Sequence, residues 1–80
     1  MSKRSEIIKY LLDLGLDVDT RNYNIKAYKN DGRVVMIGEW GKYQIQALSK
    51  FEEYFGNKAN EVFMKIAEYC CIDVENRSKK

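Results

Sequence analysis

The chain has 80 residues, of which 45% are hydrophobic, and it carries a net charge of +2 at pH 7. This length suits one domain with a small core, and the hydrophobic fraction excludes a disordered chain. The small net charge does not by itself indicate a nucleic-acid-binding protein. We therefore expect one α+β domain over residues 1–80, with tails at 1–4 and 75–80 that fray.

The opening residues also bear on location. The charged stretch MSKRSE runs directly into an amphipathic segment, and no apolar run approaches 18 residues. The two cysteines, Cys70 and Cys71, are adjacent, which makes a disulfide between them strained. We therefore expect free thiols, no contact with a membrane and a cytoplasmic location.

The first predicted element is a helix over residues 5–14. Its apolar stripe consists of Ile7, Ile8, Leu11 and Leu12. Ser2 or Ser5 can cap its start, and Gly15 is placed to end it in a left-handed conformation. Residues 16–22 are rich in Asp and Asn and are predicted to form a loop.

Residues 5–24 resemble the second helix and exit loop of an ankyrin repeat. The matching residues are Glu6, Ile7, Ile8, Lys9, Leu11, Leu12, Gly15, Asp17 and Val18. The resemblance covers about a quarter of the chain, and no Thr-Pro-Leu-His segment or second repeat follows. Because one repeat cannot bury its own apolar face, the resemblance implies a glycine-capped helix and no function.

A β-hairpin is predicted around Asn30-Asp31-Gly32, between the strand-like residues 23–29 and 33–39. A two-residue Asp31-Gly32 turn mixes the two faces, whereas a three-residue loop with left-handed Gly32 pairs Ile25 with Ile37. We favour the second register because it gathers apolar side chains. That face consists of Tyr23, Ile25, Ala27, Val35 and Ile37. The opposite face consists of Asn24, Lys26, Tyr28, Val34 and Met36.

Residues 41–56 admit two interpretations. As a helix ended by Gly56, they share one apolar face. As a strand, residues 43–47 alternate and add a third strand to the sheet, and Ser49 to Glu52 then forms a capping box. We favour the helix because it accounts for more apolar positions. The helical face consists of Tyr43, Ala47, Leu48, Phe51, Tyr54 and Phe55.

Residues 57–71 are predicted to form the helix on which the core is built. Asn57 is its expected N-cap. The apolar face consists of Ala59, Val62, Phe63, Ile66, Ala67 and Cys70. The predicted fold is thus an N-terminal helix, a β-hairpin or three-stranded antiparallel sheet, and two C-terminal helices.

No catalytic or cofactor motif is present. Histidine is absent, which removes the commonest general base and metal ligand. The two cysteines are too few for a zinc site, and the acidic residues near Asp17 lack the EF-hand pattern. Gly38 and Gly41 have no phosphate-loop context. We therefore expect a protein that is not an enzyme and that holds no metal or cofactor.

One patch interleaves cations with aromatic residues. It consists of Lys26, Tyr28, Lys29, Arg33, Trp40, Lys42 and Tyr43. Our first hypothesis is a small regulator, adaptor or inhibitor, of the kind that phages or mobile elements encode, which binds another protein through this patch. The alternative is nucleic-acid binding through the basic aromatic hairpin, residues 26–33 and 40–43. A homodimer is left open.

Overall fold

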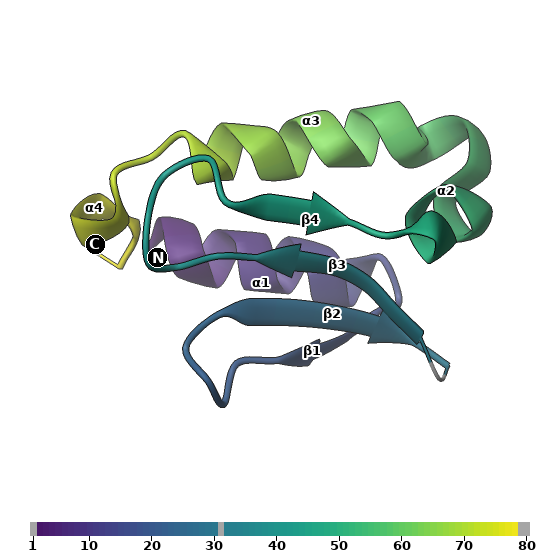
Figure 1. Cartoon of the computed structure of the whole chain (residues 1–80), viewed down its shortest axis with the longest axis horizontal. Helices are drawn as coiled ribbons and strands as arrows, with labels where there is room; N and C mark the ends of the chain where they lie inside the picture. The colour runs from purple at the N-terminus through teal and green to yellow at the C-terminus, as the bar shows by residue number, and fades with distance from the viewer. Residues whose placement is uncertain (1, 31, 79–80) are drawn as a thin grey trace.

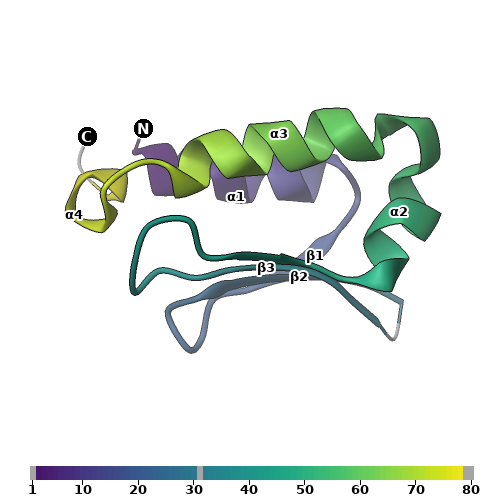
Figure 2. The same ribbon diagram turned by 45° about the horizontal axis from the view of Figure 1, so that its top comes forward.

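The computed structural model describes residues 2–30 and 32–78. The elements in chain order are α1 (Lys3–Asp13), β1 (Asp17–Asp19), β2 (Ile25–Lys29), β3 (Gly32–Ile37), β4 (Ile45–Ala47), α2 (Ser49–Phe55), the 3-10 turn η1 (Gly56–Lys58), α3 (Ala59–Cys70) and α4 (Val74–Arg77). The strands form one antiparallel sheet in the order β1-β2-β3-β4, and α1 and α3 cover one of its faces (Figures 1 and 2). The predicted α+β class is confirmed, with four strands in the sheet.

Helix α1 begins and ends as its sequence predicts. The Ser5 N–H donates to Ser2 Oγ at 3.1 Å, which caps the first turn. Gly15 has φ of 87° and donates its N–H to the Leu12 carbonyl at 2.9 Å, while the Leu16 N–H reaches the Leu11 carbonyl at 3.3 Å. This pair of bonds is a Schellman motif, and it turns the chain back so that Leu16 is buried with Leu11.

Strand β1 lies in a segment for which the sequence predicts a loop. Val18 stands opposite Ala27 of β2, and the two flanking aspartates stand opposite Tyr28 and Lys26. The segment has one apolar residue between two acids, so it has no alternation long enough to indicate a strand. Pairing with β2, rather than local propensity, forms this strand, and the loop prediction is wrong for residues 17–19.

The hairpin has the predicted register but a different turn. Ile25 pairs with Ile37 and Ala27 with Val35, as expected. Lys29 pairs with Gly32, and Asn30, the described residue between them, is left-handed with φ of 57°. The predicted three-residue loop is therefore wrong. Of its three residues, Asp31 lies outside the described part of the chain.

A register shift restores the alignment of the two strands. Between Ala27 and Tyr28 the partner positions step from Val35 to Arg33, which leaves Val34 as the extra residue of a β-bulge. Val34 is fully buried beside Val35, although alternation placed it on the opposite face. The prediction for Val34 is wrong because the extra residue of a bulge departs from the strict alternation of a strand.

Residues 41–56 form a strand and then a short helix. Ile45 and Ala47 pair with Ile37 and Val35, so the strand interpretation is confirmed and the single helix is wrong. Helix α2 begins at Ser49 without a side-chain cap, so the capping box does not form. Gly56 ends α2 with φ of 56°, as expected.

Helix α3 follows the 3-10 turn directly, so its N-cap position is Lys58 and not the predicted Asn57. Its buried residues are Val62, Ile66, Tyr69 and Cys70. Phe63 was expected in the core but is 37% exposed and packs edge-on against Phe51, with ring centroids 6.2 Å apart. The core-facing stripe is therefore rotated slightly from the predicted one.

The core lies between the sheet and the helices α1 and α3, and α2 closes one end of it (Figure 2). Its buried members are Ile7, Leu11, Leu16, Ile25, Ala27, Val34, Val35, Ile37, Phe51, Val62, Ile66, Tyr69 and Cys70. The predicted tails are also part of the structure where it is described, because Arg4 belongs to α1 and Arg77 to α4. Arg77 is 1% exposed, so residues 75–77 do not form the frayed end that was expected.

Candidate functional site

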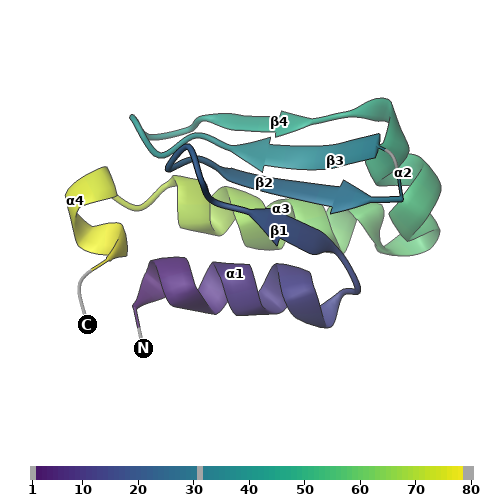
Figure 3. The same cartoon turned by 90° about the horizontal axis from the view of Figure 1, so that it is seen from below.

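Three exposed aromatic side chains gather at one end of the sheet. Tyr23 lies in the β1–β2 loop and is 42% exposed, while Trp40 and Tyr43 lie in the β3–β4 loop and are 73% and 67% exposed. The two loops are side by side at the same end of the molecule (Figure 3). The Tyr23 and Trp40 rings are in contact, with centroids 5.3 Å apart and planes tilted by 57°. We call these three residues the aromatic end.

Two of these residues have strained backbones. Tyr23 has φ of 73° and Tyr43 has φ of 65°, a region that bulky side chains rarely occupy. Such a conformation costs about 1–3 kcal/mol per residue and persists only where the surroundings hold it. The Tyr43 N–H donates to the Cys70 carbonyl at 2.9 Å, and the Tyr23 carbonyl accepts from Arg4 at 3.0 Å. Both loops are thus fixed by contacts with helices.

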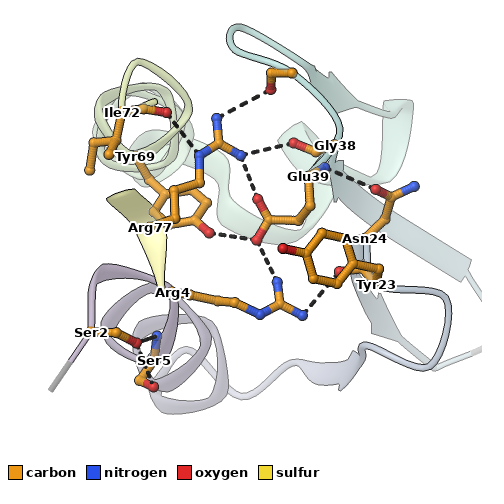
Figure 4. A network of polar contacts seen from close by, with 11 residues as sticks. Ser2, Arg4, Ser5, Tyr23, Asn24, Gly38, Glu39, Tyr69, Ile72 and Arg77 are labelled. Carbon is orange, nitrogen blue, oxygen red and sulfur yellow. Dashed lines mark hydrogen bonds and ion pairs between the residues drawn. The ribbon is translucent and has the colours of Figure 1, made fainter. Parts of the chain in front are cut away.

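Glu39, next to Trp40 in the chain, is the centre of these contacts. The residue is 1% exposed, and its side chain accepts hydrogen bonds from the Arg4 and Arg77 guanidinium groups and, at 2.6 Å, from the Tyr69 hydroxyl (Figure 4). The Glu39 N–H donates to Asn24 Oδ1 at 2.9 Å, which joins the two loops. The inward direction of Glu39 leaves its neighbour Trp40 pointing to solvent.

Arg77 connects this carboxylate to the rest of the fold. Its Nε donates to the Ile72 carbonyl at 3.0 Å, and its terminal nitrogens donate to the carbonyls of Gly38 at 3.0 Å, Gly41 at 3.3 Å and Cys70 at 3.0 Å. A guanidinium group has five N–H donors in a planar fork, and here the donors are shared among the β3–β4 loop and the end of α3. Arg77 therefore fixes the loop that carries Trp40 and Tyr43.

Two titratable groups beside Glu39, Tyr69 and Cys70, have raised pKa values. Burial, together with the hydrogen bond to Glu39, raises the pKa of Tyr69, so the phenol stays protonated and donates. Burial also raises the pKa of Cys70 to about 11, so its thiol is not a nucleophile near neutral pH. The Tyr69, Cys70, Glu39 and Arg77 side chains are all shielded from solvent. The cluster is suited to holding the loops in place.

The predicted patch does not form one surface. Lys26, Tyr28 and Arg33 lie on the sheet face opposite the helices, where Tyr28 stands beside Arg33. Lys29 lies on the other side, because its Nζ donates to the Gly15 carbonyl at 3.4 Å and sits 5.4 Å from the centroid of the Tyr54 ring. The structure therefore separates Lys29 from the other hairpin cations.

The remaining three predicted residues do share one loop. Trp40, Lys42 and Tyr43 all lie between β3 and β4. The Lys42 ammonium is 3.4 Å from the Asp73 carboxylate and 5.1 Å from the centroid of the Tyr43 ring. The loop is thus brought against the segment between α3 and α4 as well as against Arg77.

The sequence did not indicate the residues that hold this site, which include Asn24 and Tyr69. Tyr23 continued the alternation of β2 and was therefore placed in the core. Arg4 and Arg77 lay in segments that were expected to fray, and Glu39 was given no role. No local pattern could have indicated that Glu39 is buried, because Glu is rarely buried unless it is paired, and its partners Arg4 and Arg77 are far away in the chain.

Within residues 2–30 and 32–78 no helix has the length and apolar character that a membrane span needs. The same residues contain no group of three or more side chains arranged to hold a metal ion. Comparisons of the chain with protein-family models, with curated proteins and with solved structures find no significant match.

Proposed function

We propose that the protein acts by binding another protein through the aromatic end, and that it catalyses no reaction. The observation that carries this proposal is the contact of Trp40, 73% exposed, with Tyr23 across two loops that a buried ionic cluster holds. Trp and Tyr are the residue types whose truncation most often weakens protein–protein binding. A loop that is already fixed loses little conformational entropy when a partner binds.

The energetics of the loops support the same role. Two tyrosines with positive φ and a carboxylate buried with two arginines all lower stability relative to an ordinary loop with glycine and an apolar core. Their shared effect is to hold large apolar rings in water. Such a ring gains about 25 cal/mol for each Å² of apolar surface that a partner covers. The expected partner therefore presents an apolar pocket that can receive an indole ring, and the protein would act as a regulator, adaptor or inhibitor.

The test compares Trp40→Ala with Met64→Ala. Met64 is also an exposed apolar side chain, but it lies on α3 away from the two loops. Partners would be captured from the lysate of the source cells, with nuclease added, and the captured protein then titrated against each variant. We expect Trp40→Ala to weaken binding by about 2 kcal/mol or more, roughly a thirtyfold change in Kd, and Met64→Ala to have little effect. Equal affinity of wild type and Trp40→Ala would contradict the proposal.

A second candidate function is nucleic-acid binding by the sheet face opposite the helices. Lys26, Tyr28 and Arg33 all lie there, and Arg33 Nε is buried without a hydrogen-bond partner among the described residues. Cations suit phosphates, and an exposed phenol can stack on an unpaired base. Because Lys29 lies on the other side of the sheet, it provides a matched charge control.

This second candidate is tested by titration with single- and double-stranded oligonucleotides at low and physiological salt. Lys26→Ser and Arg33→Ser should each reduce the salt slope of log K by about one unit, while Lys29→Ser should leave the slope unchanged. No binding by the wild type at low salt would exclude this function. Equal effects of all three substitutions would indicate that the oligonucleotide is attracted by the overall positive charge and not by one face of the sheet.

A further inference from the structure

Helix α4 is attached to the rest of the fold mainly by one side chain. Of its four described residues, Arg77 alone is buried, while Glu75 and Asn76 are exposed. Its N-cap residue, Asp73, makes no side-chain bond to the first turn, although its carbonyl accepts from the Asn76 N–H at 2.9 Å. The helix stands at one end of the molecule, beyond the ends of α1 and α3 (Figures 1 and 2). A segment with so little buried apolar surface opens more easily than the core does.

The buried cluster contains one carboxylate and two guanidinium groups. Glu39 Oε1 accepts from Arg4 and from the Tyr69 hydroxyl, while Glu39 Oε2 accepts from Arg77. When Arg77 leaves, Glu39 therefore keeps one cation and one hydroxyl, and the departing guanidinium group enters water. Breaking a buried ion pair is costly chiefly because one charge is left without a partner. Since Glu39 keeps Arg4, the release of Arg77 costs less than the loss of the whole cluster.

Arg77 holds the second half of the β3–β4 loop. One of its terminal nitrogens donates to the Gly41 carbonyl at 3.3 Å and to the Cys70 carbonyl at 3.0 Å. The same Cys70 carbonyl accepts from the Tyr43 N–H at 2.9 Å. Tyr43 has φ of 65°, a conformation that persists only while its surroundings hold it. When Arg77 leaves, the strain at Tyr43 therefore favours a relaxed loop.

The two halves of this loop differ in how they are held. In the first half, the Glu39 N–H donates to Asn24 Oδ1 at 2.9 Å, a contact that does not involve α4. In the second half, the Lys42 ammonium lies 3.4 Å from the carboxylate of Asp73, which directly precedes α4. Release of α4 therefore frees residues 40–43 and leaves Glu39 in place.

We propose that α4 is a releasable strap, anchored by Arg77, which controls the geometry of the aromatic end. When the strap is docked, Trp40 and Tyr43 are held in the arrangement described above. When it is released, residues 40–43 become mobile while the sheet, α1 and α3 remain folded. As a control of partner binding the strap rests on the proposed function, because a partner that recognises the held loop binds only the docked molecules and raises their fraction. Its existence rests only on contacts within the chain.

The first measurement uses the wild type and needs no substitution. Amide hydrogen exchange compares the protection of the Tyr43 N–H, which bonds to the Cys70 carbonyl, with that of the Ile66 N–H in the buried middle of α3. Release of the strap exposes little surface, so Tyr43 should be at least about tenfold less protected than Ile66, with little dependence on urea. Equal protection of the two amides, with equal dependence on urea, would show that α4 opens only when the whole domain unfolds and would overturn the proposal.

The second measurement weakens the anchor and keeps its charge. A lysine has one ammonium group and cannot reach the carboxylate and the loop carbonyls together, so Arg77→Lys favours the released strap. The protection of the Tyr43 amide should fall by at least about tenfold, while Ile66 stays the better protected amide and circular dichroism shows a folded domain. Glu75→Gln, a change at an exposed position of α4, should leave both amides as in the wild type. Unchanged protection of Tyr43 in Arg77→Lys, or an unfolded variant, would contradict a separable strap anchored by Arg77.

The fluorescence of Trp40 gives an independent readout, because it is the single tryptophan of the chain. Its anisotropy should be lower in Arg77→Lys than in the wild type and in Glu75→Gln. Equal anisotropy in all three proteins would show that α4 does not control the aromatic end, and the proposal would fall. Neither measurement uses a partner. If both give the expected result but Trp40→Ala binds the partner as tightly as the wild type does, the strap stands and the proposed function is wrong.

Discussion

Arg77 and Glu39 are 38 positions apart in the chain and form an ion pair in which the two side chains are 1% and 2% exposed. Removing both charges from water costs several kcal/mol per ion, and the attraction between them returns that cost only when other hydrogen bonds complete the site. Here Arg4 and Tyr69 donate to Glu39, and Arg77 donates to the backbone carbonyls of Gly38, Gly41 and Cys70. The pair therefore determines which loop conformation forms more than how stable the fold is.

Glu39→Gln should be among the most destabilising substitutions in the chain. It leaves two guanidinium groups facing a neutral amide in a buried site, and breaking one member of such a pair costs about 3–5 kcal/mol. The free energy of unfolding, measured by urea titration, checks this value. Glu75→Gln is the matched control, because Glu75 is exposed in α4, and its effect should stay within about 0.5 kcal/mol. Similar values for the two variants would show that the buried cluster does not constrain the fold.

Ile66 and Phe63 should differ in their effects, although both were predicted to lie in the core. Ile66 is fully buried, so Ile66→Ala should cost about 2–5 kcal/mol. Phe63 is 37% exposed, so Phe63→Ala should cost less than Ile66→Ala. The measurement is thermal or urea unfolding of the two variants and the wild type under the same conditions. A larger loss for Phe63→Ala would place it in the core after all.

Tyr43→Asn should separate stability from binding. Asparagine adopts a positive φ more readily than tyrosine, so this substitution relieves strain and should leave the free energy of unfolding unchanged or raised by about 0.5–1 kcal/mol. It also removes an exposed ring from the aromatic end, and the partner affinity should fall. Both quantities are measured on the same sample. A clear loss of stability would show that the Tyr43 ring, rather than its backbone, supports the loop.

Stability should fall as the pH rises above about 9. The pKa of Cys70 is raised by burial from 9.0 to about 11, so between these values the unfolded chain loses a proton that the folded chain keeps. The unfolded state then binds fewer protons, and the free energy of unfolding decreases with pH. Cys70→Ala should remove the part of this slope between pH 9 and 10, below the ordinary pKa of tyrosine, 10.0. Urea titrations at intervals of half a pH unit measure it, and an unchanged slope would contradict the assignment.

Much of the helical and hairpin structure follows from local signals in the sequence. Gly15 ends α1 because only a residue without a side chain readily adopts its φ, and its position after the Ile7 to Leu12 stripe is visible in the sequence. The register of Ile25 against Ile37 follows because a shift by one residue would expose every apolar side chain of the hairpin. Both features depend on residues close together in the chain.

The features that were missed depend on distant residues. The bulge at Val34 and the pairing of β1 are set by contacts across the sheet. The position of Tyr23 is set by Trp40 and Arg4, which lie far from it in the chain. Its alternation with Ile25 predicted a place on the apolar face of the hairpin, but the side chain is exposed. Arg77 had no local pattern at all, since a four-residue helix has no apolar stripe. The sequence therefore indicated Trp40 and Tyr43 as candidate binding residues, but it did not indicate the contacts that fix their loop.

The place of Arg77 in the chain also bears on the order of folding. Every other member of the Glu39 cluster is synthesised before Arg77, because the ribosome adds residues from the N-terminus. Until Arg77 emerges, the Glu39 carboxylate lacks one of its two arginines, and the β3–β4 loop lacks the hydrogen bonds that Arg77 donates to the Gly38 and Gly41 carbonyls. The contacts that fix the loop bearing Trp40 beside Tyr23 are therefore complete only when α4 has been made.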